Sequence, residues 1–206
     1  MRRIARRRTA VLRAAAITGV ALVLAGCVSL VPKSKPSQLF RFGVPSAATP
    51  ARTEGVGVFR AGGVFAREAA GDRILTMTGD RAAYIAQVRW VAPAEVLFDE
   101  AVATAFDAAP GRVRLVSRGE PTRAELALRL DVRNFETRYE ESETPVVLIR
   151  VRAVLARPSR GEASEQLFEA RATAERNRVG SIVTAYNEAL AKVLGEIVTW
   201  TNSQAT

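Results

Sequence analysis

The sequence SIVTAYNEALAKVLGEIVTWT, residues 181–201, predicts a long amphipathic helix near the end of the chain. Its apolar residues recur at helical spacing on one face. That face consists of Ile182, Val183, Tyr186, Leu190, Val193, Leu194, Ile197 and Val198. Ser181 is the predicted N-cap. A helix of this length buries such a stripe by lying on a sheet, so packing in the core is favoured over binding of another protein.

The strands of that sheet are predicted from alternation of apolar and polar residues. Leu126–Val132 alternates strictly, with Ala127, Arg129, Asp131 and Arg133 on the wet face. Val146–Leu155 is apolar enough for a central strand, and Pro158–Gly161 is predicted to turn the chain. Leu167–Ala174 forms the next strand, and the small residues on one of its faces predict a tight contact with a helix. Those residues are Ala170, Ala172 and Ala174.

The N-terminal half contributes further strands and a second helix. Strands are expected at Leu39–Phe42, at Gly55–Phe59, at Arg73–Thr78, at Ala82–Trp90 after a Gly79-Asp80 turn, and at Arg112–Val116. The apolar spacing over Ala94–Ala108 predicts a helix that Pro110-Gly111 ends. The expected fold class is α+β, an α/β sandwich in which two amphipathic helices pack on one face of a mixed, mostly antiparallel sheet.

An export signal precedes this domain. Six arginines and no acidic residue come before the apolar run Ala14–Ala25, which is too short to span a bilayer as a permanent helix. The run ends at Leu24-Ala25-Gly26-Cys27, which contains the only cysteine of the chain. We interpret residues 1–26 as a lipoprotein signal peptide, residues 27–36 as a lipidated tether and residues 37–206 as the functional domain.

Cys27 is the predicted lipid-attachment site. Its thiol would carry a diacylglycerol and its freed amino group an N-acyl chain such as palmitate, because stable membrane anchoring needs more than one chain. An ordinary signal peptide, a membrane anchor with an incidental cysteine, and twin-arginine export remain as alternatives. The residue directly after the cysteine is Val28. In enteric-type bacteria, an aspartate at this position retains lipoproteins in the inner membrane, and this chain has none there. The prediction is therefore an outer-membrane protein facing the periplasm.

Composition argues against several function classes. The chain has no histidine, which removes the commonest general base and metal ligand. Six of its 30 basic residues lie in the signal peptide, which leaves 24 against 21 acidic residues and no electrostatic footprint for nucleic acid. We therefore expect no enzyme activity, no catalytic residues, no metal, no cofactor beyond the lipid on Cys27, and no nucleic-acid partner.

Three polar or glycine-rich features are candidate sites. Gly55–Phe59 with Gly62-Gly63 is interpreted as a strand and a turn, because no helix follows to bind a phosphate. The acidic cluster of Glu140, Glu141 and Glu143 falls at a predicted hairpin tip, where solvation argues against catalysis. Four arginines could form a basic stripe for lipid headgroups or an acidic partner, although pairing with nearby carboxylates is favoured. They are Arg129, Arg133, Arg150 and Arg152.

The order of these features resembles the ABC-type transport auxiliary lipoproteins, the family of PqiC-like and Mla/Mce-associated lipoproteins. The motifs that carry the resemblance are Phe40-Arg41-Phe42, Arg89-Trp90 before a proline and helix, and Ala185–Leu190 in a final helix that ends near Trp200. Leu39-Phe40 departs from the tyrosine pair that family members often have at this point.

The resemblance implies a function that is positional rather than catalytic. The protein would dock the periplasmic assembly of a lipid or hydrophobic-molecule transport system to the membrane, with an MCE-domain substrate-binding protein and an ABC permease and ATPase as partners. A homo-oligomer, ring or dimer, could form through an edge strand such as Leu39–Phe42. The alternatives are a lipid-binding carrier with its own cavity and an envelope-structural lipoprotein.

Overall fold

A computed structural model describes residues 36–46, 55–116, 120, 124–140 and 144–205. Residues Met1–Pro36 and Ser37–Thr206 form two separate units, and the second is described below. Its strands are β1 Gln38–Phe40, β2 Val56–Ala61, β3 Arg73–Thr78, β4 Arg81–Trp90, β5 Val113–Val116, β6 Leu126–Arg138, β7 Val146–Arg157 and β8 Glu162–Thr173. Its helices are α2 Arg67–Ala70, α3 Ala94–Ala108 and α4 Val179–Gln204.

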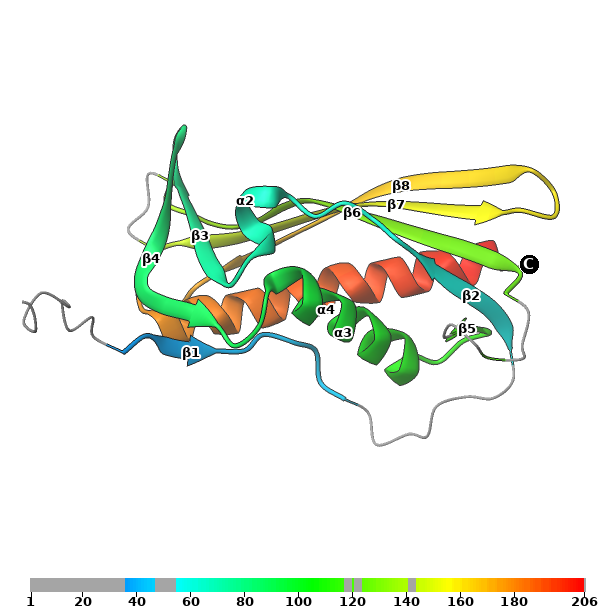
Figure 1. Ribbon diagram of the computed structural model, residues 1–206, viewed down its shortest axis with the longest axis horizontal. Helices are drawn as coiled ribbons and strands as arrows, with labels where there is room; N and C mark the ends of the chain where they lie inside the picture. Colours follow the sequence, from blue (N-terminus) through cyan, green and yellow to red (C-terminus); the bar gives the residue numbers. More distant parts are fainter. Residues whose placement is uncertain (1–35, 47–54, 117–119, 121–123, 141–143, 206) are drawn as a thin grey trace, which may run out of the picture. The chain divides into compact units, whose positions relative to one another are not determined.

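Strand β6 is the centre of one mixed sheet (Figure 1). One edge of β6 pairs with β7, and β7 pairs with β8, both in antiparallel register along nearly their full length. The other edge pairs in parallel with two short strands, β2 at Leu126–Arg129 and β3 at Thr137–Arg138. Strand β5 extends the sheet beyond β2, and β4 and β1 extend it beyond β3. The predicted mixed, mostly antiparallel α+β fold is confirmed.

The chain stays attached to β6 as it passes from β2 to β3. Val64 accepts a hydrogen bond from the Val132 amide at 2.8 Å, and the Ala66 amide donates to the Val132 carbonyl at 3.0 Å. Gly63 lies so close to β6 that a Cβ atom there would be 1.8 Å from the Leu130 carbonyl oxygen. The glycine pair that was interpreted as a turn is thus a close backbone approach, which only glycine permits.

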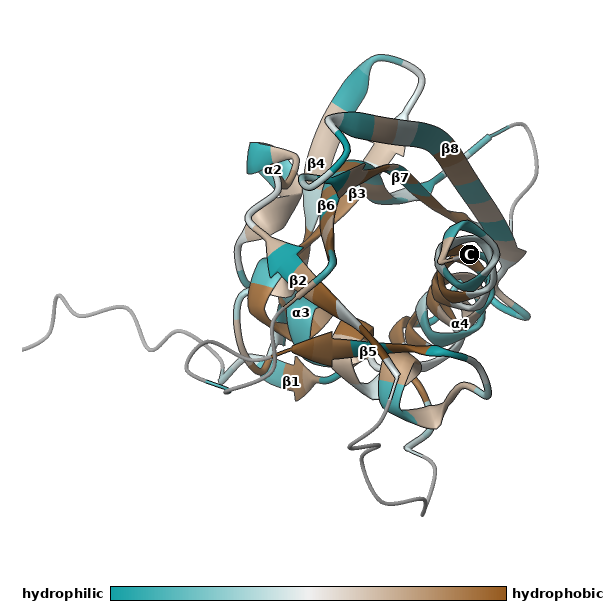
Figure 2. Cartoon of the chain, turned by 90° about the vertical axis from the view of Figure 1, so that its right-hand side faces the viewer, coloured by the Kyte–Doolittle hydropathy of each residue, from teal (hydrophilic) through white to brown (hydrophobic). Residues whose placement is uncertain are grey.

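The β3–β4 hairpin projects from one end of the sheet (Figures 1 and 2). Gly79 has a φ of +55° at the first position of its two-residue turn, as a type II′ turn requires. Lower in the hairpin, the pairing shifts from Leu75 with Tyr84 to Arg73 with Arg89, which leaves a bulge that contains Gln87 at a φ of +57°. A bulge bends its strand, and the end of β4 beyond it runs alongside β1.

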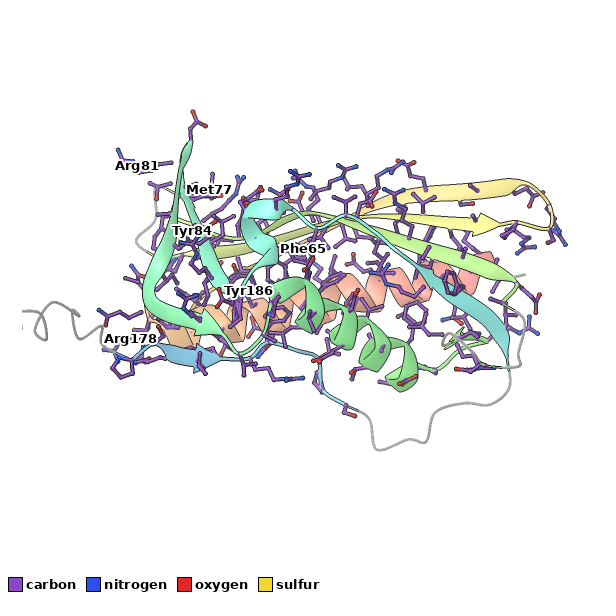
Figure 3. All side chains as sticks on the ribbon, viewed as in Figure 1. Phe65, Met77, Arg81, Tyr84, Arg178 and Tyr186 are labelled. Carbon is purple, nitrogen blue, oxygen red and sulfur yellow. The ribbon has the colours of Figure 1, made fainter. Side chains whose placement is uncertain are left out.

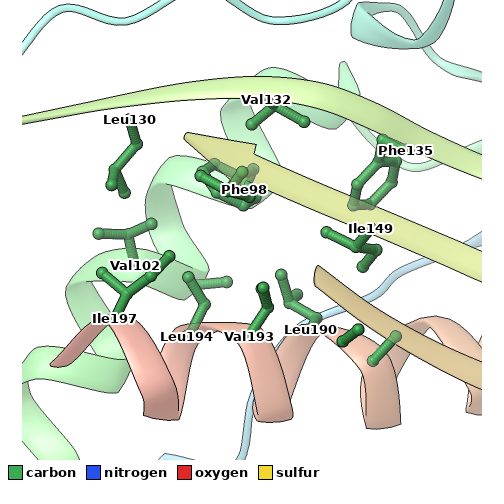
Figure 4. Close-up of a cluster of buried hydrophobic side chains, with 14 of the residues drawn as sticks. Phe98, Val102, Leu130, Val132, Phe135, Ile149, Leu190, Val193, Leu194 and Ile197 are labelled. Atoms are coloured by element: carbon green, nitrogen blue, oxygen red, sulfur yellow. The ribbon is translucent and has the colours of Figure 1, made fainter. Parts of the chain in front are cut away.

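Helices α3 and α4 cover one face of the sheet and bury its core. Figure 4 shows the part of this core that comes from α3, α4, β6 and β7, and the other strands add further buried side chains. Figure 2 shows the sheet curving around these helices. All eight apolar residues of the predicted stripe are buried in α4, so its assignment to the core is confirmed. The predicted bounds of α3 are also confirmed. The predicted N-cap Ser181 is wrong, because α4 begins two residues earlier with Arg178 at the N-cap and without a side-chain cap.

An aromatic cluster joins the first strand to the last helix. Phe42 packs against Trp90 and Phe135 with ring centroids 4.9 Å apart in both pairs, and Phe135 lies 4.9 Å from Tyr186. Thr137 donates a hydrogen bond of 3.3 Å to the Tyr186 hydroxyl, and burial raises the pKa of Tyr186. The predicted strand Leu39–Phe42 is therefore only partly correct. It ends at Phe40, and Phe42 belongs to the core.

Candidate functional site

The predicted lipid-attachment residue, Cys27, lies outside the described residues. The same holds for the signal peptide, for nearly all of the tether and for Glu141 and Glu143 of the acidic cluster. Glu140 is described, and it accepts a hydrogen bond of 3.1 Å from Arg171.

The outer faces of β6, β7 and β8 carry a group of charged side chains that pair with one another. This charged outer face consists of Arg129, Asp131, Arg133, Arg150, Arg152, Glu165, Glu169 and Arg171. All four arginines of the predicted basic stripe belong to it, and each lies within 4.0 Å of a carboxylate. The stripe is therefore an ion-paired, mixed-charge surface, as pairing with nearby acids predicted, and it offers no uncompensated positive patch to an anion.

Asp131 is the one member of this face whose side chain is buried, at 3% exposure. It accepts hydrogen bonds from Arg129 Nε at 2.9 Å, from Arg152 at 3.3 Å and from the Val64 amide at 3.0 Å. Burial alone would raise the pKa of Asp131, but these three donors outweigh burial and lower the pKa below its usual value. Asp131 therefore has a structural role, because it fixes the segment that crosses from β2 to β3. The alternation in the sequence predicts this residue on the wet face of the strand, whereas its side chain is buried.

The charges on β8 are held by the neighbouring strand. Arg152 forms a two-point contact with Glu165, and Arg150 contacts Glu169 with Nε at 2.7 Å. The hydrogen bonds from Arg152 lower the pKa of Glu165, and those from Arg150 and Arg171 lower the pKa of Glu169. These carboxyls stay ionised at neutral pH, so they provide fixed charges and no proton donor for general acid catalysis.

The projecting hairpin presents a second exposed surface. Figure 3 places Arg81 near its tip and Met77 and Tyr84 along its length. The Tyr84 ring lies 3.8 Å from the Arg73 guanidinium, and its hydroxyl donates to the Glu68 carbonyl at 2.9 Å. These contacts fix the base of the hairpin to α2 and leave its outer half exposed.

Hollows over the described residues are surface grooves. One, of about 400 Å³, lies beside the hairpin at Met77, Arg138 and Tyr139. Another, of about 590 Å³, lies between β8 and α4, where Trp200 packs on Phe168 at 5.7 Å. The side chains that face inward from the sheet and the two long helices are themselves almost fully buried, in accord with a filled core.

Among the described residues, no group of three or more potential metal ligands is present. Within the same residues, no helix combines the length and apolar character needed to cross a membrane. The 26-residue α4 alternates buried and exposed positions along its whole length.

Sequence reasoning missed the first half of β8, which pairs only with β7 among the described residues. The predicted strand began at Leu167, whereas β8 begins at Glu162, because its first five residues are polar or small and are exposed. The only signal for this extension was the length of the preceding strand, with which β8 pairs from Arg157 onward.

These features describe a domain with a filled α+β core and with charged and grooved surfaces. Residues 43–198 match the family model described as the ABC-type transport auxiliary lipoprotein component. The chain belongs to this family, and the predicted resemblance is confirmed. Membership makes it a lipoprotein of the cell envelope associated with ABC-type transport, and the family is not one of known enzymes.

Solved structures share the fold. Protein XCC0632 from Xanthomonas campestris superimposes with a TM-score of 0.69 at 21% identity, over 81% of this chain and 95% of that one. The hypothetical protein CT253 from Chlamydia trachomatis superimposes with a TM-score of 0.51 at 12% identity, over 72% of this chain and 96% of that one. A comparison with curated proteins gave no significant match.

Proposed function

We propose that the protein is the outer-membrane-anchored auxiliary lipoprotein of an MCE- or Mla-like ABC transport system for lipids or other hydrophobic molecules. Lipid chains on Cys27 would hold the domain at the periplasmic face of the outer membrane. There the domain would dock the periplasmic part of the system, through an MCE-domain substrate-binding protein and an ABC permease and ATPase. Self-association of the domain is part of this proposal.

The family match over residues 43–198 carries this proposal. The packed interior supports a docking role rather than transport of a ligand inside the domain. A carrier needs an apolar cavity of several hundred Å³ that encloses its ligand, and the space between sheet and helices is filled by side chains such as Phe98, Phe135 and Leu190 (Figure 4).

Two alternative functions are compatible with the same lipid anchor on Cys27. A lipid-binding carrier would hold its ligand in a surface groove, and the groove beside Met77 and Tyr139 is the candidate because its lining is mainly apolar. Co-purification of a stoichiometric lipid would favour the carrier. An envelope-structural lipoprotein would instead bind peptidoglycan or an assembly machine.

The test is recovery of partners with the full-length lipoprotein from gently solubilised membranes. Recovery of an MCE-domain protein or its permease with the native protein would support the proposal. Recovery of only peptidoglycan or outer-membrane assembly proteins would overturn it.

Two variants at the anchor serve as controls. A Cys27→Ser protein removes the lipid site, and we expect it to lose processing, membrane anchoring and partner recovery together. A Val28→Asn protein changes the next residue and keeps the thiol, and it should be processed normally. If Cys27→Ser remained anchored and normally processed, the lipid premise would be wrong.

A further inference from the structure

The longest strand edge left open in the described part of the chain belongs to β8. In those residues β8 pairs with β7 only, over all 12 residues from Glu162 to Thr173. The edge predicted to mediate self-association, at β1, is only three residues long. An open edge is a template for another strand unless it is short, bulged, covered or charged. The β7–β8 register is continuous, without a bulge, and the charges of Glu165, Glu169 and Arg171 on this strand are paired within the chain.

The free hydrogen-bonding groups on this edge can be assigned. The Ala174 amide donates to the Pro145 carbonyl, so the even-numbered residues of β8 exchange backbone bonds with β7. The amides and carbonyls of the odd-numbered residues therefore point away from the sheet. Their side chains, which include Glu165, Glu169 and Arg171, lie on the exposed outer face, whereas Phe168 and Ala170 face α4 and are buried.

We propose that a second copy of this chain adds its β8 antiparallel to this edge, with the two-fold axis at Phe168. The strand midpoint falls between Leu167 and Phe168, so a two-fold axis at either residue gives the greatest overlap of the two strands. With the axis at Leu167, Glu165 would face the partner's Glu169, and like charges directly opposite are destabilising. With the axis at Phe168, Glu165 faces the partner's Arg171 twice, once on each side of the axis.

The surroundings of the edge fit a second copy. The groove between β8 and α4 opens beside this edge. Its helix wall combines small residues with two charged ones, namely Ala191, Gly195, Thr199 and Ser203 with Lys192 and Glu196. Two-fold symmetry would bring α4 of the partner alongside α4, and small residues let two helices approach closely. Trp200 and Phe168, which line the same groove, supply aromatic contact area at its floor.

This inference deepens the self-association within the proposed function and does not depend on the transport role. A failure to recover transport partners would leave the edge pairing intact. Conversely, a monomeric domain that still recovered an MCE-domain protein would overturn the edge pairing and the self-association, and would leave the transport role standing.

The test uses charge reversal in the full-length protein in detergent, with mass measured by sedimentation over a range of concentrations. Glu165→Arg places two arginines opposite each other at both pairs, and Arg171→Glu places two glutamates there. Each variant alone should self-associate roughly tenfold to a hundredfold more weakly than the native chain. Glu95→Arg, an equal charge change at an exposed position of α3, is the matched control and should associate like the native chain.

The association of a mixture of the two variants is the decisive measurement. In a two-fold interface centred on Phe168, a Glu165→Arg chain and an Arg171→Glu chain restore both opposite-charge pairs, so an equimolar mixture should associate within about threefold of the native chain. Circular dichroism checks that each variant is folded. In the native chain, amide exchange at Leu167 and Glu169 should slow as concentration rises.

Three results would overturn the proposal. The first is a native chain that stays monomeric at about 100 µM, a concentration far above the dissociation constants of specific assemblies. The second is single variants that associate like the native chain. The third is a mixture of the two variants that associates no better than either variant alone. The amide-exchange measurement decides the matter if a variant does not fold.

Discussion

Replacing Gly63 by alanine is expected to destabilise the domain strongly, although the residue is exposed. The added Cβ atom would lie 1.8 Å from the Leu130 carbonyl oxygen and 2.7 Å from its carbonyl carbon, both in the backbone of the central strand β6. No rotamer change can relieve a clash between two backbone-fixed positions. Gly62, the neighbouring residue, has nothing within 4 Å of its Cβ position and provides the matched control.

The expected loss in the free energy of unfolding follows from the hydrogen bonds that the clash would break. Relieving it requires the crossing segment to move by an ångström or more, which separates Val64 from Asp131 and from Val132. A hydrogen bond to a charged group contributes roughly 1.5–3 kcal/mol and a neutral one about 1 kcal/mol, and buried groups left unpaired add to the cost. We expect Gly63→Ala to lower the free energy of unfolding by about 3–5 kcal/mol.

The assay is urea denaturation monitored by tryptophan fluorescence, for which the buried Trp90 is a suitable probe. Gly62→Ala should change the free energy of unfolding by no more than about 0.5 kcal/mol. Equal stabilities for the two variants, or a loss below about 1 kcal/mol for Gly63→Ala, would refute the close approach of this segment to β6.

Three further predictions concern single side chains. Asp131→Asn keeps the shape of the side chain but removes a charge whose pKa is lowered in the folded state. The stability that the charge contributes is complete above the unfolded pKa of about 3.9 and is lost as the pH falls through the lower folded value, so the variant's deficit in the free energy of unfolding should shrink on acidification below pH 4. A deficit that is constant with pH would contradict this assignment. Gln87→Gly should stabilise the domain by up to about 1 kcal/mol in the same urea assay, because glycine adopts the positive φ of +57° without strain. Ala86→Gly in the adjacent position should not stabilise it. Val28→Asp should move the lipoprotein from the outer- to the inner-membrane fraction of a density gradient, whereas Val28→Asn should not, and unchanged fractionation of both would oppose the proposed sorting.

The sequence predicted the parts of the fold that depend on local periodicity. The α3 bounds and the α4 stripe were predictable because each buries one continuous face, and Gly79-Asp80 marked its hairpin through turn chemistry. Helix α2, only four residues long, had no periodicity to detect. The start of α4 was misplaced because Ser181 has a capping side chain, whereas the helix begins at Val179 without using one.

Long-range features could not be predicted from local patterns. The attachment of both β2 and β3 to one edge of β6 depends on the close approach at Gly63, and a glycine pair in sequence also fits a turn. Asp131 alternates as a wet-face residue and is nevertheless buried by the arginines and the Val64 segment that cover it. The free edge of β8 depends on which strands lie beside it, which no single segment encodes.

The position of β6 sets an order of assembly. Strands β6, β7 and β8 pair with their sequence neighbours, whereas β2 and β3 need a template that follows them by about 60 residues, as in the pairing of Thr76 with Thr137. A chain that emerges N-terminus first can pair β3 with β4 and β2 with β5, but one edge of β2 and one edge of β3 stay open until β6 exists. Such strands are prone to aggregate, so we expect newly made chains to depend on holding chaperones until residue 138 has emerged.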